Sequence, residues 1–236
     1  MRDTFYRAED SGVVEIEFEI VEDKCDKAYP WLYSLFIKVD TTKNSEAYEN
    51  FLETKEAIII SLTYNDLAKY VGMRMIDGWS ELYFYARDGK NIDAIVSNML
   101  KDNYFKYETS IVKDLKWDFY HKNLYPSELE FIYIDSAKII SELEEEGDDL
   151  SIKRDVEHYA SFDTTTQRDR FIKAALDAGY SYKDDISSEE FDYGVALVRE
   201  QIVTKEAIFE TAKELYELAK KERGYYELWS TTLCLK

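Results

Sequence analysis

Apolar and polar residues alternate strictly near the N-terminus, and this period of two predicts a half-exposed strand over Val14–Val21. Three glutamates occupy one side of it, and the other side carries Val14, Ile16, Phe18 and Ile20. The next stretch, Pro30–Asp40, is apolar on both faces. A strand of this kind is buried on both sides, so we expect it in the middle of a sheet.

Four further elements complete the pattern of the first half. A helix is predicted from Ser45 to about Leu62, and a second over roughly Ile92–Lys101. Two strands, Lys69–Ile76 and Glu81–Arg87, flank an Asp77-Gly78 pair that is typical of a tight hairpin turn. A last strand is predicted over Phe105–Val112. The order is β-α-β-β-α-β, preceded by one extra strand.

A predicted helix and an acidic run separate the two halves. The segment WDFYHKNLYP, residues 117–126, closes the first domain, and Ser127 with Glu130 has the spacing of a capping box. The helix that starts there has one apolar face and ends in the acidic run Glu142–Asp149, which we interpret as solvated. The predicted domains are therefore 1–126, a linker helix with the acidic run over 127–150, and 151–236.

The second half repeats the order β-α-β-β-α-β without clear residue identity to the first. Its predicted elements are a strand over Asp155–Phe162, a helix from Thr164 to Gly179, strands over Tyr180–Asp184 and Tyr193–Glu200, a helix over Lys205–Glu222 and a final strand over Tyr225–Leu235. Right-handed crossovers place both helices of each unit on one side of its sheet. The expected fold class is α+β: two ferredoxin-like β-α-β-β-α-β sandwiches, antiparallel sheets with helices on one face.

Charge narrows the function classes. The 236-residue chain has a formal net charge of -19. Residues 1–125 contain 16 basic and 23 acidic residues, and residues 126–236 contain 14 and 26. Such a surface repels phosphate, and no Lys/Arg run with interleaved aromatic residues occurs, so direct nucleic-acid binding is disfavoured. A basic protein partner, or solubility alone, fits the charge better.

The location is expected to be the cytoplasm, without membrane insertion. Cys25 and Cys234 form neither a CxxC motif nor a zinc-site spacing, so we interpret both as reduced thiols. The N-terminal residues have no signal-peptide core, and the longest apolar run, Ala57–Ile60, is too short to cross a bilayer. No cofactor or metal is expected.

No catalytic constellation stands out, so we predict that the protein is not an enzyme. His158 shares a strand face with apolar residues and is interpreted as a core histidine, whereas His121 lies in the domain-closing segment. No phosphate-binding or dinucleotide-binding glycine motif is present. The many carboxylates form accidental pairs, and a solvated surface is the favoured interpretation.

Two features are candidates for partner binding. The first is acidic and could bind an Arg/Lys-rich segment, or could simply be a solubilising loop. It comprises the run Glu142–Asp149 and a carboxylate cluster: Asp184, Asp185, Glu189, Glu190 and Asp192. The second is the segment Tyr225–Trp229, with Tyr226, Glu227 and Trp229 as its candidate contacts, because aromatic residues are enriched at binding hot spots. The alternative is that these residues pack the last strand. Strict alternation would direct Tyr225 and Trp229 to one face of the last strand, and Tyr226 and Leu228 to the other.

The C-terminal half resembles a known family of regulators. The segments VEHYASFDTTTQRDRFIKAALDAGY and YGVALVRE, and the long helix into GYYELWST, are similar to the regulator of ribonuclease E activity B (RraB) family over about Lys153–Leu233. In the family's Gly-x-Tyr-Asp-Gly-Trp motif, this chain has Glu227 in place of Asp and Leu228 in place of Gly. The resemblance implies a ferredoxin-like fold and a non-catalytic role in binding a ribonuclease or its scaffold and restraining RNA decay.

The N-terminal half resembles an uncharacterised bacterial domain that is often fused to that regulator. The matching pieces are Tyr29–Leu32, the strand ELYFYA over Glu81–Ala86, and residues 117–120 with 124–126. We therefore expect a non-catalytic protein-binding regulator with an acidic surface and a basic partner. Two alternatives stay open: a ligand-binding protein or enzyme that uses a sheet face or the cleft between domains, and an immunity-like protein that neutralises a basic partner.

Overall fold

The computed structural model describes residues 2–10, 12–21, 26–39, 45–64, 66–101, 105–186 and 193–235. The chain divides into two compact units, Met1–Tyr125 and Pro126–Lys236, which are described separately below. Each unit combines one antiparallel sheet with helices packed against it, so the α+β class expected from the sequence is confirmed.

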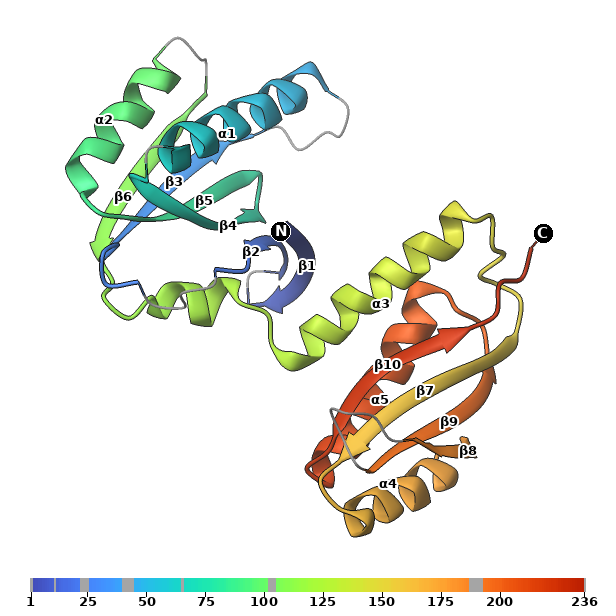
Figure 1. Ribbon diagram of the computed structural model, residues 1–236. Coiled ribbons are helices and arrows are strands. Elements are labelled where there is room, and N and C mark those ends of the chain that lie inside the picture. The colour runs from blue at the N-terminus through green and yellow to red at the C-terminus, as the bar shows by residue number, and fades with distance from the viewer. Residues whose placement is uncertain are drawn as a thin grey trace. The chain divides into compact units, whose positions relative to one another are not determined.

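The first unit contains six strands in the order β1-β2-β4-β5-β3-β6. The elements are β1 Arg2–Glu9, β2 Gly12–Glu19, β3 Trp31–Lys38, α1 Glu46–Tyr64, β4 Ala68–Ile76, β5 Trp79–Ala86, α2 Gly89–Leu100, β6 Tyr107–Lys113 and the π-helical segment η1 Tyr120–Leu124. Helices α1 and α2 lie on the same side of this sheet (Figure 1). Without β1 and β2, the remaining four strands have the order of a β-α-β-β-α-β sandwich.

Two details at the start of the chain differ from the prediction. The hydrophilic segment Arg2–Glu9 forms a strand, paired in register with β2 from Arg2–Glu19 to Glu9–Gly12. Only Phe5 among its residues is buried, so its apolar signal is a single position. The strand predicted over Val14–Val21 ends at Glu19, and Ile20 is half exposed beyond it.

The predicted hairpin turn between β4 and β5 is confirmed, with φ of 50° at Asp77 and 72° at Gly78.

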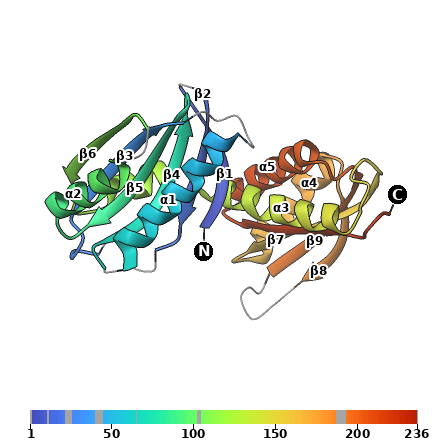
Figure 2. The ribbon, with the colours of Figure 1, turned by 90° about the horizontal axis from the view of Figure 1, so that it is seen from above.

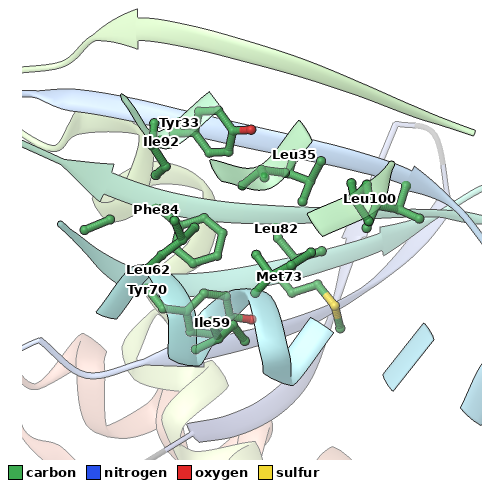
Figure 3. Packing of buried hydrophobic residues seen from close by; sticks show 14 of the residues in the cluster. Tyr33, Leu35, Ile59, Leu62, Tyr70, Met73, Leu82, Phe84, Ile92 and Leu100 are labelled. Atoms are coloured by element: carbon green, nitrogen blue, oxygen red, sulfur yellow. The ribbon is translucent and has the colours of Figure 1, made fainter. Parts of the chain in front are cut away.

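The core of the first unit lies between the sheet and helices α1 and α2. Tyr33, Leu35, Tyr70, Leu82 and Phe84 project from the strands toward α1 and α2 (Figure 3). The helices contribute Ile58, Ile59, Leu62, Ile92 and Val96, each at most 3% exposed. The alternation in the strands and the helical period in α1 and α2 thus bring two apolar surfaces together.

Residues 117–124 pack on buried side chains of the strands. Trp117 stacks on Tyr85 with ring centroids 4.0 Å apart, and its indole N–H donates to the carbonyl oxygen of Tyr29 at 3.1 Å. Tyr120 and Leu124 are fully buried. The short pieces that carry the N-terminal resemblance, around Tyr29, Tyr85 and Trp117, therefore contact one another and form part of the core.

The second unit contains four strands in the order β10-β7-β9-β8. Its elements are α3 Glu128–Glu145, β7 Arg154–Phe162, α4 Thr165–Asp177, β8 Ser181–Ile186, β9 Tyr193–Gln201, α5 Lys205–Lys221 and β10 Tyr225–Thr231. Counted from β7, this is the order 4-1-3-2 of a β-α-β-β-α-β sandwich. Helices α3, α4 and α5 lie together on one side of the sheet (Figure 2).

Side chains cap the three helices of the second unit, and the cap of α3 is the predicted one. Ser127 and Glu130 form the reciprocal capping box of α3. Thr164 accepts a hydrogen bond from the backbone N–H of Gln167 at the start of α4, and Thr204 caps α5. Each cap satisfies an otherwise unpaired backbone donor and contributes about 1 kcal/mol to stability.

Helix α3 is part of the second unit rather than a linker, which corrects the prediction for residues 127–150. Its Tyr133 stacks on Phe209 of α5 at 4.4 Å, and Ser136 accepts a hydrogen bond from the indole of Trp229 in β10. The acidic run is also not wholly solvated, because Asp148 is buried and forms a bidentate ion pair with Arg154. The helical period of the apolar residues in α3 predicted a buried face, but it did not indicate that α5 and β10 would cover that face.

In the part of the chain that the structure describes, no helix is both long and apolar enough to cross a membrane.

Candidate partner-binding face

The second sheet has one side without helices, which we call the open face. Val156, His158 and Ala160 of β7 point to the helices, so the residues between them point the other way. The strand registers then place these residues on the open face: Asp155, Glu157, Tyr159 and Ser161 of β7; Gly194, Ala196, Val198 and Glu200 of β9; Ser181, Asp184 and Ile186 of β8; and Tyr225, Leu228 and Ser230 of β10.

The open face is strongly acidic. Two bulge residues join it through their contacts, since Lys183 pairs with Glu157 and the carboxylate of Glu227 accepts a hydrogen bond from Ser161. With these, the face has five carboxylates and one lysine in the described strands. Lys183 holds the pKa of Glu157 below its ordinary value. Within the described residues, the side chains of three carboxylates have neither a hydrogen bond nor an ion pair: Asp155, Asp184 and Glu200.

Exposed aromatic and aliphatic side chains accompany the carboxylates. Tyr225 is 55% exposed and Leu228 38% exposed. Tyr159 is half-buried, and its hydroxyl contacts Glu157 at 3.1 Å and Ser230 at 2.9 Å. Exposed aromatic and aliphatic side chains with polar residues around them are typical of protein-binding surfaces.

A β-bulge at Glu227 decides which aromatic residues reach the open face. Tyr226 pairs with Ala160 and Leu228 with Tyr159, so Glu227 is an extra residue in β10. The bulge directs both Tyr226 and Trp229 into the core, where they are 5% and 1% exposed. This corrects the expected alternation and shows that Tyr226 and Trp229 are core residues rather than surface contacts. Glu227 itself is exposed.

The structure separates the two aspartates of the predicted acidic cluster. A second bulge, at Lys183, leaves Asp184 opposite Ala196 on the open face and Asp185 opposite Val195 on the helix side. There Asp185 pairs with Arg168 of α4 at 2.8 Å. The other three members of the predicted cluster, Glu189, Glu190 and Asp192, lie outside the described residues.

His158 lies in the core, as expected from its strand face. It is 1% exposed, and its Nδ1 is 2.9 Å from the hydroxyl of Tyr226. Burial, with a smaller effect of Arg199, lowers the pKa of His158 to about 3, so the ring is neutral near pH 7. Its Nε2 has no hydrogen-bond partner among the described residues, and in this respect the expectation of a satisfied histidine is only half met.

Sequence reasoning missed several residues of the open face. Asp155, Tyr159 and Glu200 were not singled out, although the alternation that buries His158 also places Asp155 and Tyr159 on the opposite side. Leu228 was placed by strict alternation on the same side as Tyr226. The bulge at Glu227 could not be seen in the alternation, because Tyr225–Trp229 contains apolar residues in both phases.

The first unit has a polar pocket of about 510 Å³ near the end of β2. Its charged lining residues are paired with neighbours: Arg2 with Glu56, Lys69 with Asp26, and Asp66 with Arg87. Neither His121 nor Tyr120 lines it.

Comparisons with known proteins agree with the two-part organisation. Residues 134–231 match the family model Regulator of ribonuclease activity B, and residues 9–125 match the model Family of unknown function (DUF695). No curated protein matches the sequence significantly. One solved structure, an unknown protein from Galdieria sulphuraria, is 9% identical, and the alignment covers 82% of this chain and 92% of that chain. Its TM-score of 0.24 supports no conclusion about this chain.

Both resemblances seen in the sequence are thus confirmed, and both matches extend further than expected. The regulator match begins within α3, ahead of Lys153, and the N-terminal match begins in β1, ahead of Tyr29. The chain therefore joins a segment that matches a family of unknown function to a segment that matches the regulators of ribonuclease activity B.

Proposed function

We propose that this protein is a non-catalytic regulator that binds a basic protein partner, a ribonuclease or its scaffold, through the open face of its second sheet. The observation that carries the proposal is the combination on that face of five carboxylates with exposed Tyr225 and Leu228. The regulator family matches 98 residues, 134–231, and these include all the strands that form the face.

Electrostatics supports a basic partner. The chain has a formal net charge of -19, and three open-face carboxylates have no ion pair within the described residues. Unpaired carboxylates attract lysine and arginine side chains and accelerate encounter at low salt. The same charges repel nucleic acid, so the proposed target is the protein component of an RNA-degrading complex rather than the RNA.

The burial and the low pKa of His158 support a role without catalysis. His158 is enclosed in the core on the side of the sheet opposite the open face. Its low pKa keeps it neutral, so it cannot exchange a proton with a substrate at the surface. We also propose a cytoplasmic location, the compartment in which a regulator of RNA decay would meet its partner.

A cleavage assay tests this function. The rate at which a purified ribonuclease complex from the host cleaves a single-stranded RNA is measured with increasing amounts of the full chain, at low and at high salt. We expect a lower rate at low salt and a weaker effect at high salt. An unchanged rate together with no measurable binding to the complex would overturn the proposal.

Two triple variants with equal change in charge locate the effect. One removes three open-face carboxylates: Asp155→Asn, Asp184→Asn and Glu200→Gln. The control removes three exposed carboxylates of the acidic run: Glu144→Gln, Glu145→Gln and Glu146→Gln. At about 0.5–1 kcal/mol for each exposed charge pair, the open-face variant should bind about ten- to a hundredfold more weakly. Equal effects of the two variants would show that net charge, not the open face, is responsible.

A further inference from the structure

The sizes of the side chains on the open face limit which segment of a partner can pack against it. Three of its rows run across all four strands: Leu228–Tyr159–Ala196–Asp184, Tyr225–Ser161–Gly194–Ile186 and Ser230–Glu157–Val198–Ser181. In the first two rows the residue from β9 is small and buried, and in the third it is the half-buried Val198. Larger side chains flank Gly194 and Ala196 on both sides: Leu228, Tyr159 and Tyr225 on one, and Asp184 and Ile186 on the other. The side chains of the face therefore leave room for a segment along β9, with apolar contacts on either side of it.

Backbone hydrogen bonding selects the secondary structure of the occupant. A segment lying on the face of a sheet cannot pair with the strands below it, because their N–H and C=O groups already pair within the sheet. An extended segment there would leave its own buried backbone groups unpaired, and it would bind instead at a sheet edge. An α-helix satisfies its backbone internally and can lie on the face.

The dimensions agree with a single helix. Four strands at a spacing of about 4.8 Å span roughly 14 Å between the outer two. A helix with its side chains is about 10–12 Å wide, so one helix along β9 would reach the side chains on both sides of that strand.

Charge defines the polar residues of that helix. Asp155 and Glu200 are neighbours at one end of the face, Glu227 lies on the β10 side, and Asp184 lies on the β8 side. The apolar residues of the open face and the carboxylates around them are complementary to an apolar stripe flanked by lysine or arginine.

We propose that the open face binds an amphipathic, Lys/Arg-rich α-helix of its protein partner, with the helix along β9 and its apolar stripe against Leu228, Tyr159 and Val198. This inference rests on the proposed function and adds the structural class of the partner segment. An extended peptide bound at the edge of β8 or β10 is the competing outcome.

Two designed peptides of identical composition test the class of segment. Both have about 18 residues of Leu, Ala, Lys and Arg. One has leucines at i, i+3, i+4 and i+7 as in an amphipathic helix, and the other alternates apolar and basic residues as in a strand. Affinity for the full chain is measured by fluorescence anisotropy, and circular dichroism reports the peptide's conformation on binding. We expect at least tenfold tighter binding of the helical pattern, with a gain of helicity.

Substitutions at exposed apolar positions show where the peptide binds. Leu228→Glu on the open face should weaken binding of the helical peptide at least tenfold. Tyr64→Glu, at an exposed aromatic residue on α1 of the first unit, should change it less than twofold. The inference is overturned if the alternating peptide binds as tightly as the helical one, or if Leu228→Glu and Tyr64→Glu have the same effect.

Competition separates this inference from the proposed function. If the ribonuclease complex binds the chain and the helical peptide does not displace it, the helix proposal fails and the regulator proposal stands. If the complex neither binds nor changes its cleavage rate, the proposed function fails, and the helix proposal that rests on it fails as well. Displacement that is lost in Leu228→Glu supports both.

Discussion

The hydroxyl of Ser161 in β7 donates a hydrogen bond to the carboxylate of Glu227 in β10. This contact lies at the bulge that inserts Glu227 between Tyr226 and Leu228. The bulge buries Tyr226 and Trp229 and leaves Tyr225 and Leu228 on the open face. One residue in the last strand therefore determines both the packing of the core and the composition of the candidate partner-binding face.

Deleting Glu227 should destabilise the second unit strongly. Removal of the extra residue shifts the strand by one position, so either Trp229 or Tyr226 must leave the core. The expected loss is about 3–5 kcal/mol, similar to truncating a buried aromatic residue. Amide hydrogen exchange of β7 measures the stability of this unit. The control Glu227→Ala keeps the chain length and should lower the free energy of unfolding by less than about 1 kcal/mol. A deletion variant as stable as Glu227→Ala would contradict the role of the bulge.

Ser136→Ala should destabilise the same unit moderately. The indole N–H of Trp229 donates to the Ser136 hydroxyl at 3.0 Å, and both residues are at most 1% exposed. Without the hydroxyl, a buried donor remains unsatisfied, which costs about 1–3 kcal/mol. Ser141→Ala, at an exposed position of the same helix, is the matched control. The urea midpoints of the two variants are compared. Equal midpoints would contradict the packing of α3 on β10.

Asp148→Asn should cost about 3–5 kcal/mol, because it leaves the buried Arg154 guanidinium without its charged partner. Arg154 also holds the pKa of Asp148 below its usual value. This contribution to stability is present above the unfolded-state pKa of about 3.9 and is lost as pH falls through the lower folded-state value. Hydrogen exchange of β7 checks the cost, with Glu146→Gln as an exposed control. A cost equal to that of the control would contradict a buried ion pair.

His158 should make the second unit less stable in mild acid. The folded-state pKa of about 3 lies below the ordinary histidine value of 6.5, so the unfolded chain binds a proton that the folded chain does not. Stability is therefore full above pH 6.5 and falls as pH decreases toward 3, by up to about 1.4 kcal/mol per pH unit. Urea midpoints at pH 7 and pH 4.5 test this. The difference should shrink in His158→Gln and persist in His121→Gln; an unchanged difference in His158→Gln would contradict the prediction.

Periodicity and turn chemistry predicted most of the fold. The Asp77-Gly78 turn, the Ser127 cap and the strand face of His158 each follow from local residue chemistry, and the structure contains them. The strand Arg2–Glu9 was missed because Phe5 is its one buried residue, so pairing with β2 rather than an apolar face defines it.

The candidate site was harder to predict than the fold. A bulge reverses the alternation of every residue beyond it, and two bulges, at Lys183 and Glu227, fall within the predicted site. For that reason the sequence assigned Tyr226 and Trp229 to recognition. Tyr159 was overlooked although its strand alternates without a bulge. The acidic character of the region does not depend on register, and it is the part of the prediction that the open face retains.

Zero-length cross-linking tests the central claim most directly. A carbodiimide joins carboxylates to lysine amines in contact, so mass spectrometry of the cross-linked complex with the ribonuclease identifies which carboxylates of this chain meet the partner. The account predicts cross-links at Asp155, Asp184, Glu200 and Glu227, reduced at high salt. Cross-links confined to the exposed acidic residues Glu142–Glu146 or to the first unit, with none on the open face, would contradict it.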